Sequence, residues 1–374
     1  LCGTPRFVAS ALARFTPADA LTLFAGLGLR GVEEERGKVF CQQGAAALAE
    51  VLERAAREAG AVFHLGRPVD EVRREAGTFR VATAGETLAC ETLVVALGGP
   101  AWPQVGASGL GYDIATRFGL SLTPRRPGLV PLRAADKDLA FCRALAGLSL
   151  RVRPRIEVSP DGPPQGLSGV LSNASPGEMT GSTAMATSDP LAPGQGHRAT
   201  QRDAAAPGRA SRRGRARAIG AVAVPWDLDG EMLFTHTGLS GPVILDASLF
   251  WREGHVLLID LLPDRDVLAE LTRSPRLEIK NALARLLPRR LAEALCERHG
   301  WTGPVAGWSR KSLLALAGQL AAWPVAPAGT LGFPRAEVTL GGVDTARISS
   351  KTLGAMDVPG LYFTGEVLDV TGRL

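Results

Sequence analysis

The feature that most constrains the fold is an apolar run at residues 92–97, which ends abruptly at Gly98, Gly99 and Pro100. Its length and its β-branched residues are typical of a fully buried strand, so we expect a central parallel strand here. In open α/β sheets, ligands bind at the carboxyl ends of such strands, and glycines there let a ligand approach the backbone closely. The run therefore predicts a binding site at Ala96, Gly98 and Gly99. A tight turn would need the same residues, and this alternative stays open.

A second strand of the same kind is expected near the end of the chain. Residues 361–363 are apolar and lead into Gly365 and Glu366. A carboxylate at a strand end can accept hydrogen bonds from the hydroxyls of a ribose or ribityl chain. Two such strand ends suit a dinucleotide, which makes Gly365 and Glu366 candidate binding residues. A solvated turn carboxylate is the alternative for Glu366, and we expect Asp369 to cap a following helix.

Several separated blocks form a pattern that is specific only in combination. They are residues 36–40, 94–111, 124–132, 230–242 and 338–369. Together they resemble the aminoacetone-oxidase-like family of bacterial NAD(P)/FAD-dependent oxidoreductases. The resemblance implies an α/β fold with a Rossmann-like FAD-binding domain, FAD as the cofactor and NAD(P)H as a candidate electron donor. It also implies that the backbone at Val69 meets the adenine. The chain departs from the family pattern at Leu97, Trp102 and Leu110, where Thr, Tyr and Asp are usual.

The usual opening of a flavin-binding chain is absent from this sequence. Such a chain begins with a strand, a G-x-G-x-x-G turn and a helix whose N-terminus holds the pyrophosphate. Here the first stretches, residues 7–15 and 17–27, have helical character instead, and the sequence stops at residue 374, where a glycine-rich turn and helix would follow. We therefore expect an incomplete FAD-binding domain that binds FAD weakly. A degenerate relative that binds no FAD and is inactive is the alternative.

The order of apolar patterns predicts an insertion within the FAD-binding domain. The expected parts are residues 1–132 (first part of the FAD-binding domain), 133–262 (β-rich insert), 263–334 (helical subdomain) and 335–374 (return to the FAD-binding domain). Within the insert, residues 159–218 are dominated by small, polar and arginine residues and cannot bury enough apolar surface to offset their ordering entropy. We expect this segment to be disordered, or to be a reading-frame artefact.

Periodicity predicts the main elements outside that segment. Expected strands are residues 61–65, 69–72, 78–84, 150–158 and 255–262, and expected helices are residues 45–59, 264–271, 277–299 and 309–322.

The charge distribution argues against a nucleic-acid partner. The chain carries a net charge of +5, but residues 198–217 hold seven arginines and one aspartate. The remaining chain is thus close to neutral, and the basic segment lacks the interleaved aromatic residues that stack on bases. Nucleic-acid binding through this segment is therefore a distant alternative to a small-molecule substrate.

Other sequence features indicate an ordinary globular protein. There is no run of eighteen apolar residues and no secretory leader, so we expect a cytoplasmic protein. The five cysteines are scattered without C-x-x-C spacing, and no metal site is predicted. The oligomeric state is not indicated.

His236 is the candidate catalytic residue because it alone among the histidines lies in a glycine-rich motif, at residues 230–242. It could donate a proton or bind substrate, and a turn-stabilising role is the alternative. The overall prediction is an FAD-dependent oxidoreductase that takes NAD(P)H or a small amine or carbonyl compound as its donor, since the flavin carries the redox chemistry and the protein positions it.

Overall fold

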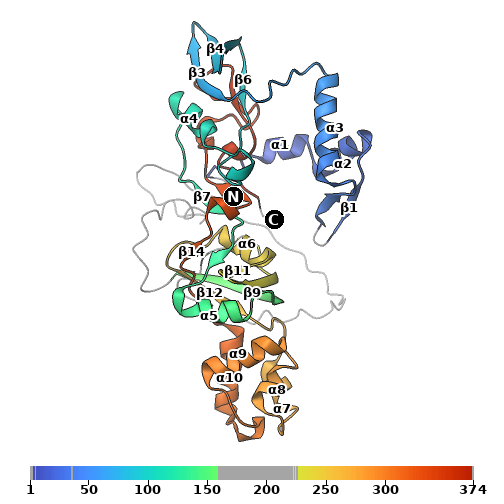
Figure 1. The fold of residues 1–374 in the computed structure, drawn as a ribbon, viewed down its shortest axis with the longest axis vertical. Coiled ribbons are helices and arrows are strands. Elements are labelled where there is room, and N and C mark those ends of the chain that lie inside the picture. Colours follow the sequence, from blue (N-terminus) through green and yellow to red (C-terminus); the bar gives the residue numbers. More distant parts are fainter. Residues whose placement is uncertain are drawn as a thin grey trace, which may run out of the picture.

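The computed structural model describes residues 3–372 with the exception of residue 5, residues 35–36 and 159–221, and residues 223 and 225. The segment predicted to be disordered, residues 159–218, therefore lies outside the described residues. Figure 1 shows three parts along the long axis of the molecule: strands β3, β4 and β6 with helix α4 at one end, a larger sheet in the middle, and helices α7 to α10 at the other end.

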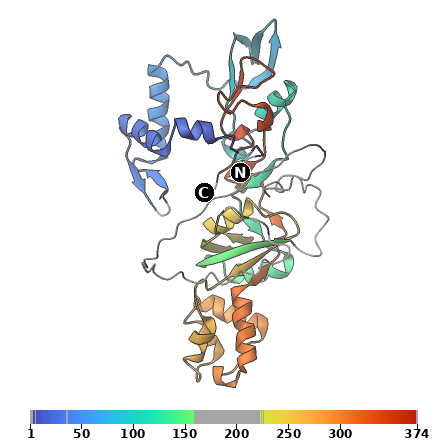
Figure 2. The ribbon, with the colours of Figure 1, turned by 180° about the vertical axis from the view of Figure 1, so that it is seen from behind.

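The N-terminal residues form a small unit that stands beside the first of these parts in both views (Figures 1 and 2). Its elements are α1 (Ala9–Arg14), α2 (Pro17–Gly26), β1 (Gly31–Glu33), β2 (Val39–Cys41) and α3 (Gly44–Glu58). Helix α2 begins at a capping box, because the Thr16 hydroxyl accepts from Asp19 N and the Asp19 carboxylate accepts from Thr16 N at 2.8 Å. The helices predicted at residues 17–27 and 45–59 are confirmed.

The strand predicted at residues 61–65 is wrong. Residues 61–64 belong to no strand, and Val62 and Leu65 are exposed. An apolar run becomes a strand only when a neighbouring strand pairs with its backbone, and none does so within the described residues.

The first domain contains the parallel strands. Its elements are β3 (Val69–Glu75), β4 (Thr78–Thr83), β5 (Glu86–Cys90), β6 (Leu93–Val95), α4 (Leu110–Arg117), β7 (Arg126–Gly128), β15 (Val338–Leu340) and β16 (Leu361–Phe363). Strand β6 pairs in parallel with β16, with Leu93 opposite Leu361 and Val95 opposite Phe363. Strands β3 to β5 form a separate antiparallel sheet, and β15 pairs with β7.

The prediction that the run at residues 92–97 is parallel is confirmed, but the prediction that it is fully buried is wrong. Val94 is 56% exposed and Leu97 is 44% exposed. The reason is that β6 has β16 as its single hydrogen-bonded neighbour in the described part of the chain. Val95, by contrast, packs against Tyr112, Phe363 and Val367 in a core cluster of this domain.

The middle of the molecule is a seven-stranded antiparallel sheet with the strand order β13-β12-β9-β10-β11-β8-β14. Its elements and covering helices are β8 (Leu132–Arg133), α5 (Asp136–Ala144), β9 (Ser149–Val158), β10 (Gly230–Thr235), β11 (Gly238–Ser240), α6 (Pro242–Ser248), β12 (His255–Asp260), β13 (Trp323–Val325) and β14 (Gly329–Thr330). Strand β9 alternates between buried and exposed residues, as its sequence predicts. We call this part the inserted domain, because the chain enters it after β7 and leaves it before β15.

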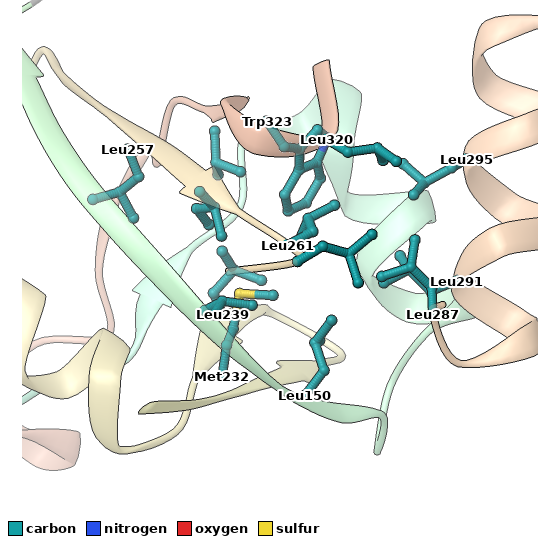
Figure 3. Packing of buried hydrophobic residues seen from close by; sticks show 14 of the residues in the cluster. Leu150, Met232, Leu239, Leu257, Leu261, Leu287, Leu291, Leu295, Leu320 and Trp323 are labelled. Atoms are coloured by element: carbon teal, nitrogen blue, oxygen red, sulfur yellow. The ribbon is translucent and has the colours of Figure 1, made fainter. Parts of the chain in front are cut away.

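The helical subdomain consists of α7 (Val267–Thr272), α8 (Ile279–Leu283), α9 (Arg289–His299) and α10 (Arg310–Ala321). The single helix predicted over residues 277–299 is wrong, since Pro288 has an extended backbone and separates α8 from α9. Leu287, Leu291 and Leu295 of this subdomain point toward Leu261, which directly follows β12 (Figure 3). Leu320 of α10 lies beside Leu261, whose N–H donates to the Leu320 carbonyl at 2.9 Å. The seven-stranded sheet and the helical subdomain thus share one hydrophobic core.

A group of positive charges lies where the two domains meet. Arg126 of β7 donates to the carbonyls of Leu249 and Trp251, just after α6, and Arg252 donates to the same two carbonyls. Burial, followed by repulsion from Arg252, lowers the pKa of Arg126 to about 9. His255 lies beside them, and its Nδ1 accepts from Arg252 N at 3.2 Å.

The shared core makes a testable prediction about stability. Leu316 is 1% exposed, whereas Leu314 in the same helix is 50% exposed. We expect Leu316→Ala to lower the free energy of unfolding by about 2–5 kcal/mol, because it removes buried methyl groups and leaves a cavity. The matched variant Leu314→Ala should change it by roughly 0.5 kcal/mol or less. Urea unfolding followed by circular dichroism measures both, and equal losses would contradict the packing described here.

The joint between the domains predicts a pH dependence. His255 is 4% exposed, and burial, then Arg252 and Arg126, lower its pKa. The unfolded chain therefore binds a proton at this residue at a higher pH than the folded chain does, so His255 destabilises the fold as pH falls below about 6.5. We expect the free energy of unfolding to fall less between pH 7.5 and pH 5.5 in His255→Asn than in the unchanged protein. Urea unfolding at the two pH values measures this loss. An equal loss in the His255→Asn variant and in the unchanged protein would show that this histidine is not responsible.

Candidate functional site

The candidate site lies at the carboxyl ends of the two parallel strands. Thr364 N donates to Val95 O at 3.1 Å, which continues the pairing of β6 and β16 by one step. The segments that follow, residues 96–99 and 364–366, therefore leave the strands side by side at one edge. The structure thus brings together Ala96, Gly98, Gly99, Gly365 and Glu366, which the sequence predicted as binding residues.

The site residues differ in exposure. Ala96 is exposed and Gly98 is half-buried, and Gly365 is exposed with a left-handed backbone. Apart from the adjoining residues of the chain, no atom of the described residues lies within 4 Å of the position that a β-carbon would take at Gly98 or Gly365. The space in front of these two strand ends is open, so a ligand can approach the backbone there.

Gly99 has a different role, because it lies under the site and not at its surface. A β-carbon at Gly99 would overlap Thr339 Oγ1 and would lie 2.7 Å from Tyr112 Oη. Both of these side chains are fully buried. Close packing alone therefore requires glycine at position 99.

Thr339 links the two strand ends to a third segment. Its hydroxyl accepts from Ala101 N at 3.3 Å, its backbone N–H donates to Glu366 Oε1 at 2.8 Å, and its carbonyl accepts from Thr371 Oγ1 at 3.3 Å. Sequence analysis did not single out Thr339, although it lies in the block at residues 338–369. A buried threonine between two apolar residues is the signal that could have revealed it, because a buried hydroxyl needs a partner.

Tyr112 is the second residue that sequence analysis missed. Its hydroxyl is buried next to Thr339 without a hydrogen bond of good geometry within the described residues. Burial, followed by the negative charge of Glu366, raises the pKa of Tyr112 to about 12, so its phenol stays protonated at neutral pH. The guanidinium of Arg125 lies 4.7 Å above the centre of its ring.

The remaining predicted residues lie elsewhere. Val69 begins β3, is half-buried and pairs with Thr83, so its backbone belongs to the antiparallel sheet of the first domain. His236 is exposed in the two-residue turn between β10 and β11 of the inserted domain. Within the described part of the chain, no hydrogen bond or ion pair connects His236 to the two strand ends. Asp369 accepts from Gly3 N at 3.2 Å and caps no helix among the described residues.

The residues at the strand ends fit the flavin half of a dinucleotide. They offer open backbone at Gly98 and Gly365 and a carboxylate, Glu366, that can accept from hydroxyls. A G-x-G-x-x-G spacing does occur at residues 26–31, but it follows helix α2 and precedes strand β1, which is the reverse of the order that places a helix N-terminus at a pyrophosphate.

Comparison with protein families matches residues 1–374 to the description "HI0933-like protein Rossmann domain". The chain belongs to the HI0933-like Rossmann family. This FAD-binding family confirms the predicted α/β, Rossmann-like fold class and indicates a flavin-type cofactor and an oxidoreductase-type fold. Membership of the aminoacetone-oxidase-like group within it stays a prediction, as do the domain boundaries and the site residues.

The chain is also similar to several curated proteins, two of which share one name. The chain is 34% identical over 383 residues to the ribosomal RNA dihydrouridine synthase of Escherichia coli, and the match covers 100% of this chain and 78% of the relative. It is 33% identical to the ribosomal RNA dihydrouridine synthase of Haemophilus influenzae, with 100% and 79% covered. It is 23% identical to the 3-dehydro-bile acid delta(4,6)-reductase of Clostridium scindens, with 98% and 78% covered.

Among the described residues, no helix is long and apolar enough to cross a membrane, and no cluster of three or more His, Cys, Asp or Glu side chains could hold a metal ion.

The packing under the site makes a prediction about Gly99. We expect Gly99→Ala to lower the free energy of unfolding by about 1–3 kcal/mol, since the added methyl group must displace Thr339 or Tyr112. Gly109→Ala is the matched control, because the nearest atom to its β-carbon would be Arg125 Nη1 at 3.7 Å, an ordinary contact distance. Thermal unfolding of the two variants compares them directly. A Gly99→Ala protein as stable as Gly109→Ala would mean that the strand end is not packed in this way.

Proposed function

We propose that this protein is an FAD-dependent reductase that converts uridine in ribosomal RNA to dihydrouridine. The observation that carries the proposal is the 34% and 33% identity, over the whole chain, to two relatives named for that reaction. This substrate replaces the small amine or carbonyl compound expected from the sequence. An electron donor of the NAD(P)H type remains part of the proposal.

The reactions for which these relatives are named are of one type. Dihydrouridine is uridine in which the C5–C6 double bond, conjugated to the C4 carbonyl, has been reduced. A delta(4,6)-reductase likewise acts on carbon–carbon double bonds. Reduction of such a bond takes a hydride at C6 and a proton at C5, and the bound flavin would supply the hydride and become oxidised.

The residues of this chain have the tasks of binding and orientation. The backbone at Gly98 and Gly365 and the carboxylate of Glu366 would hold the flavin at the two strand ends. Thr339 fixes that carboxylate, because its backbone N–H donates to Glu366 Oε1. His236 is the candidate for delivering the proton at C5 from the inserted domain, since a histidine side chain can act as a general acid.

The decisive experiment measures dihydrouridine directly. The purified protein is incubated with FAD, NADH or NADPH, and ribosomal RNA that lacks dihydrouridine, and the nucleosides are then quantified by mass spectrometry. We expect dihydrouridine to form only when reductant and protein are both present. Oxidation of NAD(P)H by a small carbonyl compound, with no dihydrouridine formed, would favour the small-molecule reading instead.

Two substitutions separate cofactor binding from turnover. We expect Glu366→Ala to lose more FAD on gel filtration than His236→Ala, because Glu366 lies at the strand end, whereas His236 lies in the turn between β10 and β11 of the inserted domain. His236→Ala should chiefly slow dihydrouridine formation. Glu366→Gln is the matched control, since its amide oxygen can still accept from Thr339 N. The reverse order of FAD loss would mean that the two roles have been exchanged.

A further inference from the structure

A pocket of about 670 Å³ opens beside the strand ends. It is lined by Pro100, Gly109, Leu122, Thr123, Pro124, Arg125 and Phe333. Its volume lies within the usual range for pockets that hold small ligands, about 300–1,000 Å³. Pro100 follows Gly99 directly, so the pocket adjoins the flavin position proposed above without including the glycines themselves.

Arg125 gives the pocket a positive charge that has no ion-pair partner among the described residues. Its guanidinium rests on the ring of the buried Tyr112, and its Nη1 lies beside Gly109 at the pocket wall. Among the described residues it makes no hydrogen bond and no ion pair. A fixed ring under the guanidinium restricts where it can lie, and a planar guanidinium without a carboxylate partner is suited to bind a phosphate group.

One aromatic residue, Phe333, lines the pocket, and Trp102 lies next to it without lining the pocket itself. Phe333 lines the pocket at the start of the short helix η4 (Phe333–Arg335), and its carbonyl accepts from Trp102 N at 3.3 Å. Trp102 has a left-handed backbone, with φ at 60°, and its side chain is 47% exposed. Non-glycine residues rarely adopt this conformation. The exposed indole, next to the pocket residue Phe333, is available to stack on a base.

We propose that this pocket binds a pyrimidine nucleotide of a single RNA strand, with Arg125 on the phosphate, Phe333 against the base and Trp102 against the neighbouring base. The proposal rests on the proposed function and names the residues that recognise the substrate. Proteins commonly bind unpaired bases by stacking them on aromatic rings and contacting the phosphate with arginine. FAD offers the same chemistry, a planar ring and phosphates, so the test must distinguish the two.

The test measures equilibrium binding without turnover. Uridine, 5′-UMP and single-stranded oligouridylate are titrated into the FAD-supplemented protein in the absence of NAD(P)H, with calorimetry as the readout. We expect Arg125→Ala to weaken 5′-UMP binding about tenfold or more and to leave uridine binding nearly unchanged, because it removes one charge-assisted contact to phosphate. Arg125→Lys should restore part of the affinity. Phe333→Ala should weaken uridine and 5′-UMP equally.

Oligouridylate adds two readouts. Trp102→Ala should weaken oligouridylate binding and leave 5′-UMP binding unchanged, since its ring contacts the neighbouring base. Arg125→Ala should lower the slope of the logarithm of the binding constant against the logarithm of salt concentration by about one. Arg310→Ala, at the exposed start of α10, is the matched control and should alter none of these values.

Three results would overturn the proposal. In the first, Arg125→Ala binds 5′-UMP as tightly as the unchanged protein. In the second, FAD displaces 5′-UMP and Arg125→Ala lowers FAD retention, which would assign the pocket to the cofactor. In the third, oligouridylate binding is insensitive to all three substitutions, so that RNA binds elsewhere. Dihydrouridine formation, measured separately, shows whether the proposed function fails as well or whether only this pocket assignment does.

Discussion

The geometry of the site depends on the hydrogen bonds of one buried threonine. Thr339 contacts the segment after β6 through its hydroxyl, the segment after β16 through its N–H, and the end of the described chain through its carbonyl. Parallel strands place their carboxyl ends at one edge, but they do not fix the loops that follow. Strand β15, antiparallel to β7, brings Thr339 between those loops and joins them. Gly99 completes this arrangement because a larger residue would displace the hydroxyl.

The short strand β7 couples the site to the inserted domain. Arg125, just before it, lies over Tyr112 in the first domain, whereas its neighbour Arg126 donates to carbonyls at the end of α6 in the inserted domain. Successive side chains of an extended segment point to opposite sides, so two adjacent arginines can serve two domains. A change in the orientation of the inserted domain relative to the first domain would therefore move the backbone that carries Arg125. The domain joint and the pocket lining thus meet at two adjacent residues, Arg126 and Arg125.

Local patterns were enough to predict the parallel strands, the alternation of β9 and the N-terminal helices. Each of these depends on side chains that are close in sequence, and the capping box at Thr16 shows how completely a helix start can be encoded locally. The hydrogen bond from Ala101 N to Thr339 joins residues 238 positions apart, and no local pattern contains it. The strand prediction at residues 61–65 was wrong for the same reason, because a strand needs a neighbouring strand that the local sequence pattern does not specify. Likewise, no local pattern shows that Arg125 and Phe333, more than 200 positions apart, line one pocket.

The net charge of a chain does not show whether the chain recognises a single RNA base. Outside residues 198–217 the chain is nearly neutral. A neutral surface attracts nucleic acid weakly at long range and gives little nonspecific binding. Recognition of a single base depends on different quantities: one well-placed cation for a phosphate and aromatic rings at stacking distance from the base. Arg125, Phe333 and Trp102 together would contribute only one positive charge to any count, so averaging over the chain conceals them. Substitutions at Arg125, Phe333 and Trp102, and not the net charge, therefore decide between an RNA base and a small molecule as the substrate.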